Sequence, residues 1–295
     1  MKSGVVIVKK CEGMSSQAVV FRVKKIFSAD KAGHTGTLDP LATGVLPVLV
    51  GRAVKASEFM LTADKYYSAT LLLGLTTDTE DITGEVLSRC EDIPKEDEVY
   101  LAASRFVGKI MQTPPMYSAL KVGGKKLYEL ARRGVTVERE PREVTVHSID
   151  ISRISDREYR LDVHCSKGTY IRTLCADIGD MLGVGGVMKT LERTRASGYT
   201  LEDSYTLEEL EGMSEEELSR VLLPTEHIFR EYKKITLPDF YARLAGNGQE
   251  IYLKKIGLEA EVGERFALYN KDGFFAVGEV TQFECGLAVK PIRQF

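Results

Sequence analysis

A short polar loop near the N-terminus holds the residues best suited to chemistry on a substrate. Between Gly33 and Leu46 the chain places His34 and two threonines before a single carboxylate, Asp39, and an apolar run after it. Pro40 has no N–H and biases Asp39 toward an extended backbone, so this side chain is less available to cap a helix. An isolated Asp-Pro pair most often opens a turn. The surrounding glycines and hydroxyl groups favour instead a loop in which Asp39 acts as a nucleophile or base.

Three further segments gather aromatic, basic and hydroxyl side chains. They are residues 65–74, which begin with a lysine and two tyrosines, residues 112–121, which contain a Pro-Pro pair, and residues 166–174, which carry Tyr170 and Arg172. Together with the Asp39 loop, these segments resemble, in the same order, the motifs of the TruB family of bacterial tRNA pseudouridine synthases. The resemblance extends from about Val5 to the C-terminus and becomes weaker after Ser197.

The resemblance implies an enzyme that isomerises uridine 55 in the T-loop of tRNA to pseudouridine. It implies that Asp39 is the catalytic carboxylate, that Tyr67 stacks on the target base and that Arg172 pairs with Asp39. The residues that it implies in binding the substrate or the RNA are His34, Gly36, Thr37, Lys65, Tyr170, Lys121, Lys125, Lys126, Arg132 and Arg133.

The reaction itself explains why these residue types are needed. The N1–C1′ bond breaks, the base turns and a bond forms through C5, with no redox change, so we predict no cofactor. A stacked uridine must first be flipped out, at a cost of roughly a few kcal/mol, while stacking on Tyr67 returns roughly 1–3 kcal/mol. A bidentate Arg172 is expected to keep Asp39 charged despite burial. Two routes stay open, namely attack of Asp39 on C6 or C1′ and abstraction of the C2′ proton to give a glycal.

The patterns around these segments predict the elements that hold them. Apolar spacing after Ser15 or Ser16 predicts a helix to residue 27, and strands are expected at 45–50, 66–73 and 161–165, with a short helix at 52–61. A helix from residue 171 to 182, ended by Gly183, places Arg172 in its first turn. With the resemblance, this predicts an α+β domain, residues 1–230, built on a mixed, largely antiparallel sheet.

The segment from residue 112 to 142 is the most basic part of the chain and is broken by prolines and glycines at its start. Taken alone, this segment is typical of a solvated, charged helical hairpin. The resemblance makes it an insertion that clasps the phosphate backbone of RNA.

Beyond residue 230 the pattern changes to short alternating runs with an Asp272-Gly273 hairpin turn. This predicts a small all-β domain over residues 231–295. By family analogy it is a PUA-like RNA-binding barrel that holds the acceptor stem, and a purely structural β cap is the alternative.

Bulk composition limits the classes of protein. The formal net charge of −3 neither requires nor excludes RNA, because phosphate binding needs only a local positive surface. No apolar run approaches the roughly 20 residues of a membrane span. The five cysteines and four histidines show no paired spacing, which argues for a reduced cytoplasmic protein without a metal site.

We therefore expect a cytoplasmic monomer that binds the T-arm and acceptor stem of tRNA without an obligatory protein partner. The nearest enzymatic alternative is the guide-RNA-dependent relative, which usually needs protein partners and has a longer PUA region. The alternative of another class is a non-catalytic module that flips and re-stacks the tRNA loop.

Overall fold

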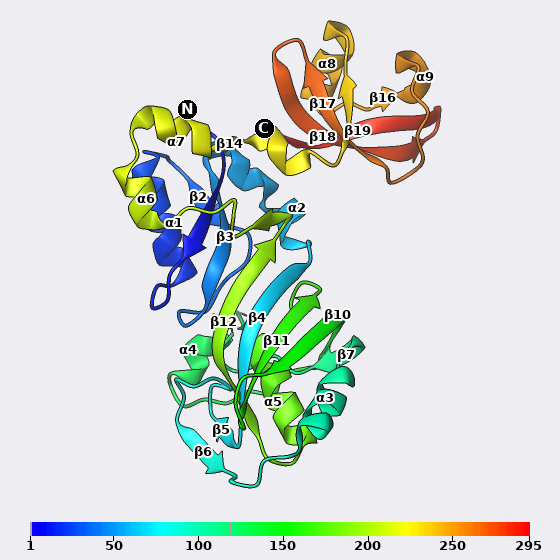
Figure 1. Ribbon diagram of the computed structural model, residues 1–295. Coiled ribbons are helices and arrows are strands. Elements are labelled where there is room, and N and C mark those ends of the chain that lie inside the picture. Colours follow the sequence, from blue (N-terminus) through cyan, green and yellow to red (C-terminus); the bar gives the residue numbers. More distant parts are fainter. Residues whose placement is uncertain (1, 119) are drawn as a thin grey trace.

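The computed structural model describes residues 2–118 and 120–295, which form a large α+β domain and a smaller C-terminal domain (Figure 1). The large domain is an elongated body built on one sheet, and the C-terminal domain packs at the end where the N-terminus lies. No helix of the described residues is both long enough and apolar enough to cross a membrane.

Among the described residues, ten strands form one mixed sheet, and all neighbouring pairs are antiparallel except β3 and β12. The predicted mixed, largely antiparallel sheet is confirmed. In spatial order the strands are β14 (Leu223–Pro224), β1 (Gly4–Lys10), β3 (Thr43–Val50), β12 (Gly186–Ala196), β4 (Lys65–Leu73), β11 (Glu158–Cys165), β10 (Arg142–Arg153) and β7 (Gly108–Gln112), with β2 (Ala32–His34) beside β3 and β13 (Tyr199–Thr200) beside β12.

Helices follow the local signals in the sequence. Helix α1 begins where the Ser15 side chain accepts a hydrogen bond from the Ala18 N–H, and its apolar face packs into the core. The helix expected at 52–61 divides into a 3₁₀ turn, Gly51–Ala56, and a short α-helix. The helices of this domain are α1 (Ser16–Ile26), α2 (Ser57–Leu61), α3 (Glu96–Ser104), α4 (Leu127–Ala131), α5 (Ile171–Met181), α6 (Leu207–Gly212) and α7 (Glu215–Val221), followed by a 3₁₀ turn, Thr225–Phe229.

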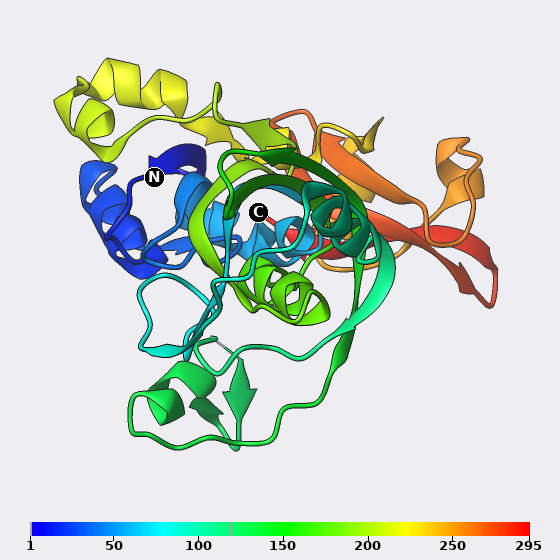
Figure 2. The ribbon, with the colours of Figure 1, turned by 60° about the horizontal axis from the view of Figure 1, so that its bottom comes forward.

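Helix α5 lies against the sheet and carries one of the catalytic candidates. Its apolar face, with Leu174, Cys175 and Ile178, is fully buried, and the sheet curves around it (Figure 2). Gly179 permits this contact, because a Cβ there would lie 2.1 Å from the backbone nitrogen of Gly186 in β12. The helix is therefore held closely against β12.

The basic insertion leaves β7 and returns through β10, so that it projects from the main body (Figure 2). It contains a two-stranded hairpin, β8 (Lys121–Val122) and β9 (Lys125–Lys126), followed by α4. A second small hairpin, β5 (Leu75–Thr77) and β6 (Val86–Arg89), follows β4.

The sequence predicted an all-β C-terminal domain. This prediction is wrong, because the domain also contains two helices. Pro238 and Asp239 are typical of a helix start, and α8 begins at Asp239 with Pro238 as its N-cap. Its elements are β15 (Lys233–Thr236), α8 (Asp239–Gly246), β16 (Ile251–Tyr252), α9 (Leu253–Ile256), β17 (Arg265–Asn270), β18 (Gly273–Phe283) and β19 (Gly286–Gln294), with the strands in the order β15-β17-β18-β19-β16.

An apolar cluster joins the two domains. Phe229 is buried between them and makes ring contacts with Phe59 of the large domain and with Phe274 and Phe295 of the small one. A surface ion pair, in which Arg293 donates to Glu58, lies beside this cluster.

Candidate active site

The loop that carries Asp39 is fixed at both sides of that residue. The Ser16 hydroxyl accepts a hydrogen bond from the Leu38 N–H at 2.8 Å and donates to the Leu38 carbonyl at 2.9 Å. On the other side, the buried Lys10 ammonium donates to the Pro40 carbonyl at 3.2 Å. The backbone on either side of the carboxylate is therefore held before any substrate arrives, which is the preorganisation that electrostatic catalysis needs.

Arg172 reaches Asp39 from the first turn of α5. Its Nη2 lies 3.0 Å from Asp39 Oδ2 and also donates to the Tyr117 carbonyl at 2.8 Å. Its Nη1 donates to the Thr79 carbonyl at 3.2 Å and lies 3.8 Å from the carboxylate of Asp81. The ion pair is present, but the predicted bidentate geometry is wrong, because the guanidinium is shared among four acceptors.

Burial and neighbouring charges have opposing effects on the pKa of Asp39. Burial raises the pKa of the Asp39 carboxyl above its ordinary value, and the Arg172 guanidinium opposes this shift only in part. The nearby Asp81 carboxylate adds to the increase, and Lys10 opposes it. Arg172 therefore lowers the pKa of Asp39, but by less than burial raises it. The raised pKa makes the ionised Asp39 a stronger base than an exposed aspartate.

Asp39 and Arg172 lie at the mouth of a cavity of about 320 Å³. This volume is near the lower end of the roughly 300–1,000 Å³ of small-molecule sites, so a single nucleotide suits it better than a large ligand. Tyr67 of β4 lines the cavity, and burial raises the pKa of its hydroxyl, which keeps the ring a neutral phenol. The other predicted residues that line it are Gly36, Thr37, Lys65 and Tyr170.

Arg193 of β12 is a residue of this cavity that the sequence analysis did not identify. It is 1% exposed, and its Nε donates to the Val45 carbonyl at 2.8 Å and its Nη2 to the Gly36 carbonyl at 3.1 Å. No carboxylate of the described residues lies within ion-pair distance of it. Burial and this cation together lower the pKa of Lys65 to about 8.

Tyr170, at the start of α5, is held by the side chain of Gln112. The buried amide accepts from the Tyr170 N–H at 2.7 Å and donates to the Tyr170 carbonyl at 3.0 Å. Gln112 is the last residue of β7, so this pair of hydrogen bonds connects the start of the basic insertion to the helix that presents Arg172.

A second, larger hollow of about 820 Å³ meets the first at Asp39 and Arg172. His34 lines it and accepts a hydrogen bond from the Gly36 N–H at its Nδ1, 3.3 Å away. Burial, with a smaller contribution from the Arg193 cation, lowers the pKa of His34, so the ring is neutral at physiological pH. A planar, uncharged group is thus placed beside the carboxylate but outside the small cavity.

Comparison with known proteins gives the family. Residues 24–171 match the family model described as TruB family pseudouridylate synthase (N terminal domain). Residues 172–230 match the one described as tRNA pseudouridylate synthase B C-terminal domain. The chain belongs to the TruB family. It is therefore a pseudouridine synthase, an isomerase, and this decides against the purely non-catalytic module.

Curated relatives of this TruB family chain cover almost its full length. It is 44% identical over 280 residues to tRNA pseudouridine synthase B of Alkaliphilus oremlandii, covering 94% of this chain and 93% of that one. It is 40% identical to tRNA pseudouridine synthase B of Clostridium tetani, covering 95% and 96% of the two chains. Among solved structures, a chain of a Cbf5-Nop10-Gar1 complex superposes with a TM-score of 0.75 at 28% identity, covering 99% of this chain and 85% of the other.

Of the predicted basic residues in the insertion whose side chains the structure describes, Arg132 lines a hollow of the site, and Lys125 and Arg133 do not. All three residues are exposed, and the hollow that Arg132 lines is the larger one. The side chains of Lys121 and Lys126 lie outside the described residues. Arg132 thus lines the same hollow as Asp39, and the RNA contacts of all these residues stay predictions.

Two histidines of this TruB family member lie together with a carboxylate, although the sequence shows no paired spacing for them. His147 and His164 lie beside Asp64, with one ligand atom of each residue within 4.8 Å of the other two. Sequence spacing could not show this, because His147 and His164 come from β10 and β11 and Asp64 precedes β4, so they meet only when the strands pair.

Proposed function

We propose that this enzyme isomerises uridine 55 in the T-loop of tRNA, after flipping that nucleotide out of the loop. The observation that carries the proposal is the position of the Asp39–Arg172 pair, where a cavity of about 320 Å³ opens into a larger hollow. A flipped nucleotide in the small cavity would meet both Asp39 and Tyr67. The rest of the loop would occupy the larger hollow, beside His34.

Each group then has a physical task. The Tyr67 ring stacks on the extruded uracil, and the neutral His34 ring fills the space that the base leaves. Asp39 attacks C6 or C1′, or removes the C2′ proton, and its raised pKa suits both tasks. Arg172, fixed by three oxygen acceptors besides Asp39, orients the carboxylate. A nucleotide seated in the cavity would itself keep water from the intermediate.

We also propose that the enzyme acts alone, as a monomer in the cytoplasm, rather than in a guide-RNA complex. Two observations support this choice. The identity to relatives named tRNA pseudouridine synthase B, 44%, exceeds that to the Cbf5 chain, 28%. The basic insertion, residues 112–142, projects from the main body (Figure 2) and contributes Arg132 to the lining of the larger hollow.

The proposal is tested by mapping pseudouridine in an unmodified tRNA transcript after incubation with the purified protein alone. We expect modification at position 55 and none in a transcript that carries cytidine there. Modification only at other positions, or only when a guide RNA or other proteins are added, would contradict the assignment.

The basic insertion should make RNA binding depend on salt. Neutralising Lys125, Lys126, Arg132 and Arg133 together should flatten the slope of log K against log salt by up to about three units, since each phosphate contact contributes ~0.7–0.9 of a unit. The slope is measured by filter binding at several salt concentrations.

A matched pair separates this effect from a general loss of charge. Neutralising Arg132 and Arg133 should flatten the slope, whereas neutralising Lys95 and Arg105, which are exposed near the two ends of α3, should not. An unchanged slope in both pairs would make the insertion a solvated hairpin.

We propose that residues 231–295 form a PUA-like domain that holds the acceptor stem. All the catalytic candidates precede residue 197, so a chain ending near Arg230 should raise KM for full tRNA while changing kcat much less. A T-arm stem-loop has no acceptor stem, and both proteins should use it about equally. Steady-state kinetics on the two substrates measures this difference.

The cut also exposes Phe229 and Phe59, which pack against the C-terminal domain. A cooperative melt of the shortened protein must therefore come first. If a well-folded truncation handles full tRNA as efficiently as the intact enzyme, the domain is a structural cap.

A further inference from the structure

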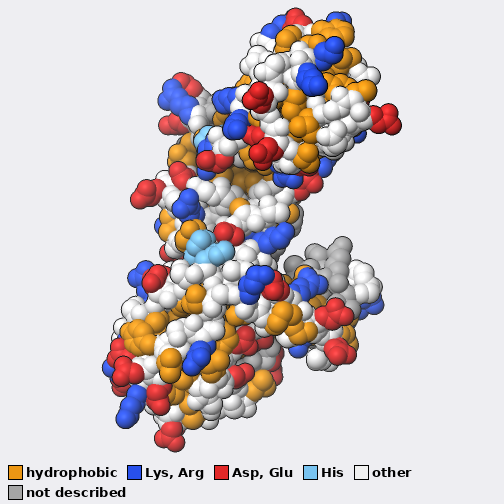
Figure 3. All heavy atoms as spheres, turned by 90° about the vertical axis from the view of Figure 1, so that its right-hand side faces the viewer, with side chains coloured by type: hydrophobic (Ala, Val, Ile, Leu, Met, Phe, Trp, Pro, Cys, Tyr) orange, Lys and Arg blue, Asp and Glu red, His pale blue; other side chains and the backbone are white. Residues whose placement is uncertain are grey.

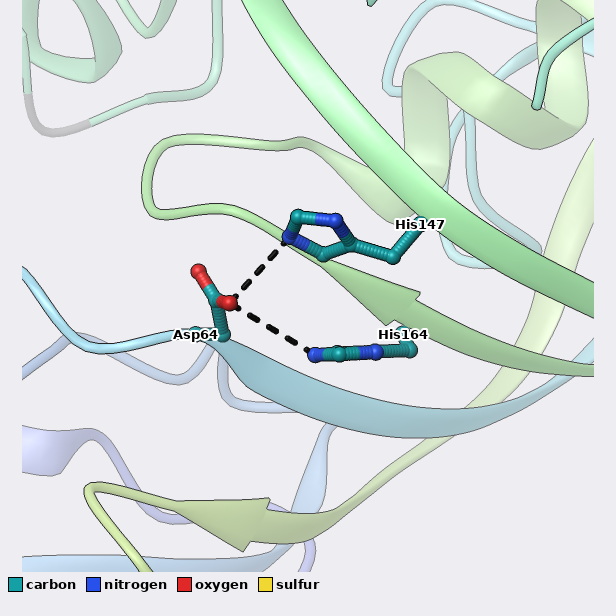
Figure 4. Close-up of side chains that lie close together, drawn as sticks. All are labelled: Asp64, His147 and His164. Carbon is teal, nitrogen blue, oxygen red and sulfur yellow. Dashed lines mark ion pairs between the residues drawn. The ribbon is translucent and has the colours of Figure 1, made fainter. Parts of the chain in front are cut away.

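Asp64, His147 and His164 form a compact cluster on the surface that the pseudouridine synthase mechanism does not use (Figure 4). The Nε2 atoms of both histidines point at one carboxylate oxygen, Asp64 Oδ2, at 3.2 Å from His147 and 3.6 Å from His164. Their side chains are 46%, 37% and 26% exposed in chain order, so an ion can enter from solvent. Histidine side chains are also seen together on the surface in Figure 3.

The spacing of these donor atoms suits a small metal ion. Two imidazole nitrogens and one carboxylate oxygen are common ligands of Zn²⁺, with bonds of about 2.0–2.2 Å. Tetrahedral geometry at that bond length places ligand atoms about 3.3–3.5 Å apart. The separations of 3.2 and 3.6 Å lie about 0.1 Å on either side of this range, and all three donors lie within 4.8 Å of one another. A cation at the centre would therefore need only small side-chain movements.

A break in the strand register brings the two histidines to the same face. Residues Val146 and Cys165 pair across β10 and β11, but the next pair is Ser148 with His164, so His147 is the extra residue of a β-bulge. Bulges redirect a side chain locally. Here the result is that His147 and His164 have ring centroids 4.4 Å apart.

The His164 ring is further held by an aromatic neighbour. Tyr66 stacks on it, with ring centroids 4.0 Å apart and planes 7° from parallel. The Arg195 guanidinium lies 5.4 Å from the Tyr66 ring centroid. A ligand whose orientation is fixed before binding loses less freedom when the ion arrives, as the outer contacts of metal-binding histidines generally ensure.

The cluster lies on the face of the sheet opposite to the catalytic cavity. Side chains alternate along a strand, and in β4 both Lys65 and Tyr67 line the cavity while Tyr66 between them stacks on His164. The side chains of the cluster, Asp64, His147 and His164, line neither hollow of the active site. An RNA substrate in the cavity would thus leave the cluster unobstructed from that side.

We propose that Asp64, His147 and His164 bind a divalent first-row transition metal ion, with Zn²⁺ as the ion they suit best. Water completes the coordination, because these three residues leave at least one position open. The ion ties β10 and β11 to the residue that precedes β4, so binding stabilises the sheet behind the active site.

Isothermal titration of tag-free, chelator-treated full-length protein with Zn²⁺ tests the site. We expect one ion per chain, and binding at least about tenfold weaker in each of Asp64→Asn, His147→Gln and His164→Gln. Zn²⁺ at a fixed concentration that saturates the parent should raise its Tm by on the order of 5 °C and that of His147→Gln by clearly less. Co²⁺ should give a visible spectrum of nitrogen and oxygen ligation without a thiolate charge-transfer band.

Matched variants exclude other sources of binding. Asp150→Asn removes an exposed carboxylate of β10, and His227→Gln removes a histidine outside the cluster, so both should bind Zn²⁺ like the parent. Titrations are done in a Cys11→Ser/Cys285→Ser background, because these two thiols are exposed. Absence of binding at micromolar protein, or binding that survives the double variant His147→Gln/His164→Gln, overturns the proposal and leaves a hydrogen-bonded surface cluster.

Discussion

Replacing Asp39 with asparagine should abolish pseudouridine formation while leaving tRNA affinity within about tenfold of the parent. The amide has the shape of the carboxylate, and its oxygen can still accept from Arg172, which now lies 3.0 Å from Oδ2. It is neither a nucleophile nor a base at neutral pH, so the chemical step loses its reacting group. Single-turnover assays on a tRNA transcript measure the rate, and filter binding measures the affinity.

Asp30→Asn is the matched control, because Asp30 is an exposed aspartate that lines neither hollow. It should keep parental activity. Pseudouridine from Asp39→Asn at more than a trace rate would mean that another group performs the chemistry.

Local patterns in the sequence were sufficient for elements whose signals are local. The helix start at Ser15 or Ser16, the alternating strand ending at Cys165 and the helix ended by Gly183 were predicted and confirmed, with Ser15 as the cap. The contact between Asp39 and Arg172 has no such local signal, because the two residues lie on segments far apart in the chain. It followed from the family resemblance, and the structure bears it out.

The buried polar partners of the site could not be predicted, because they depend on how strands align. Arg193 faces the cavity since it pairs with Tyr67 in the register of β12 and β4, which shifts between Arg193 and Arg195. Gln112 reaches Tyr170 only because β7 lies at the end of the sheet beside β10. No sequence pattern fixes such a register shift.

The net direction of the pKa shift of Asp39 could not be predicted from the sequence, for a related reason. An ion pair lowers the pKa of a carboxyl and burial raises it. Which effect is larger depends on how deeply the loop is buried and on how many acceptors share the arginine. Thr79, Tyr117 and Asp81 all share Arg172, and these contacts appear only in the folded chain.

Arg172→Lys should lower activity far more than the retained positive charge suggests, because the guanidinium contacts four acceptors at once. The guanidinium reaches Asp39 and Tyr117 through Nη2, and Thr79 and Asp81 through Nη1. A lysine has one ammonium group at the end of its chain and cannot meet acceptors on both sides. Asp39 would keep a positive neighbour but lose its fixed orientation, and we expect kcat to fall on the order of 10²-fold or more.

The loss should appear in kcat, with tRNA affinity close to that of the parent, because Arg172 is 4% exposed and offers little surface to the RNA. Arg220→Lys on α7, where the side chain is 72% exposed, is the matched control and should have no effect. Rapid-quench measurement of pseudouridine formation separates the chemical step from binding. If Arg172→Lys retains near-normal kcat, a positive charge near Asp39 is sufficient, and the four-acceptor geometry of the guanidinium does not activate the carboxylate.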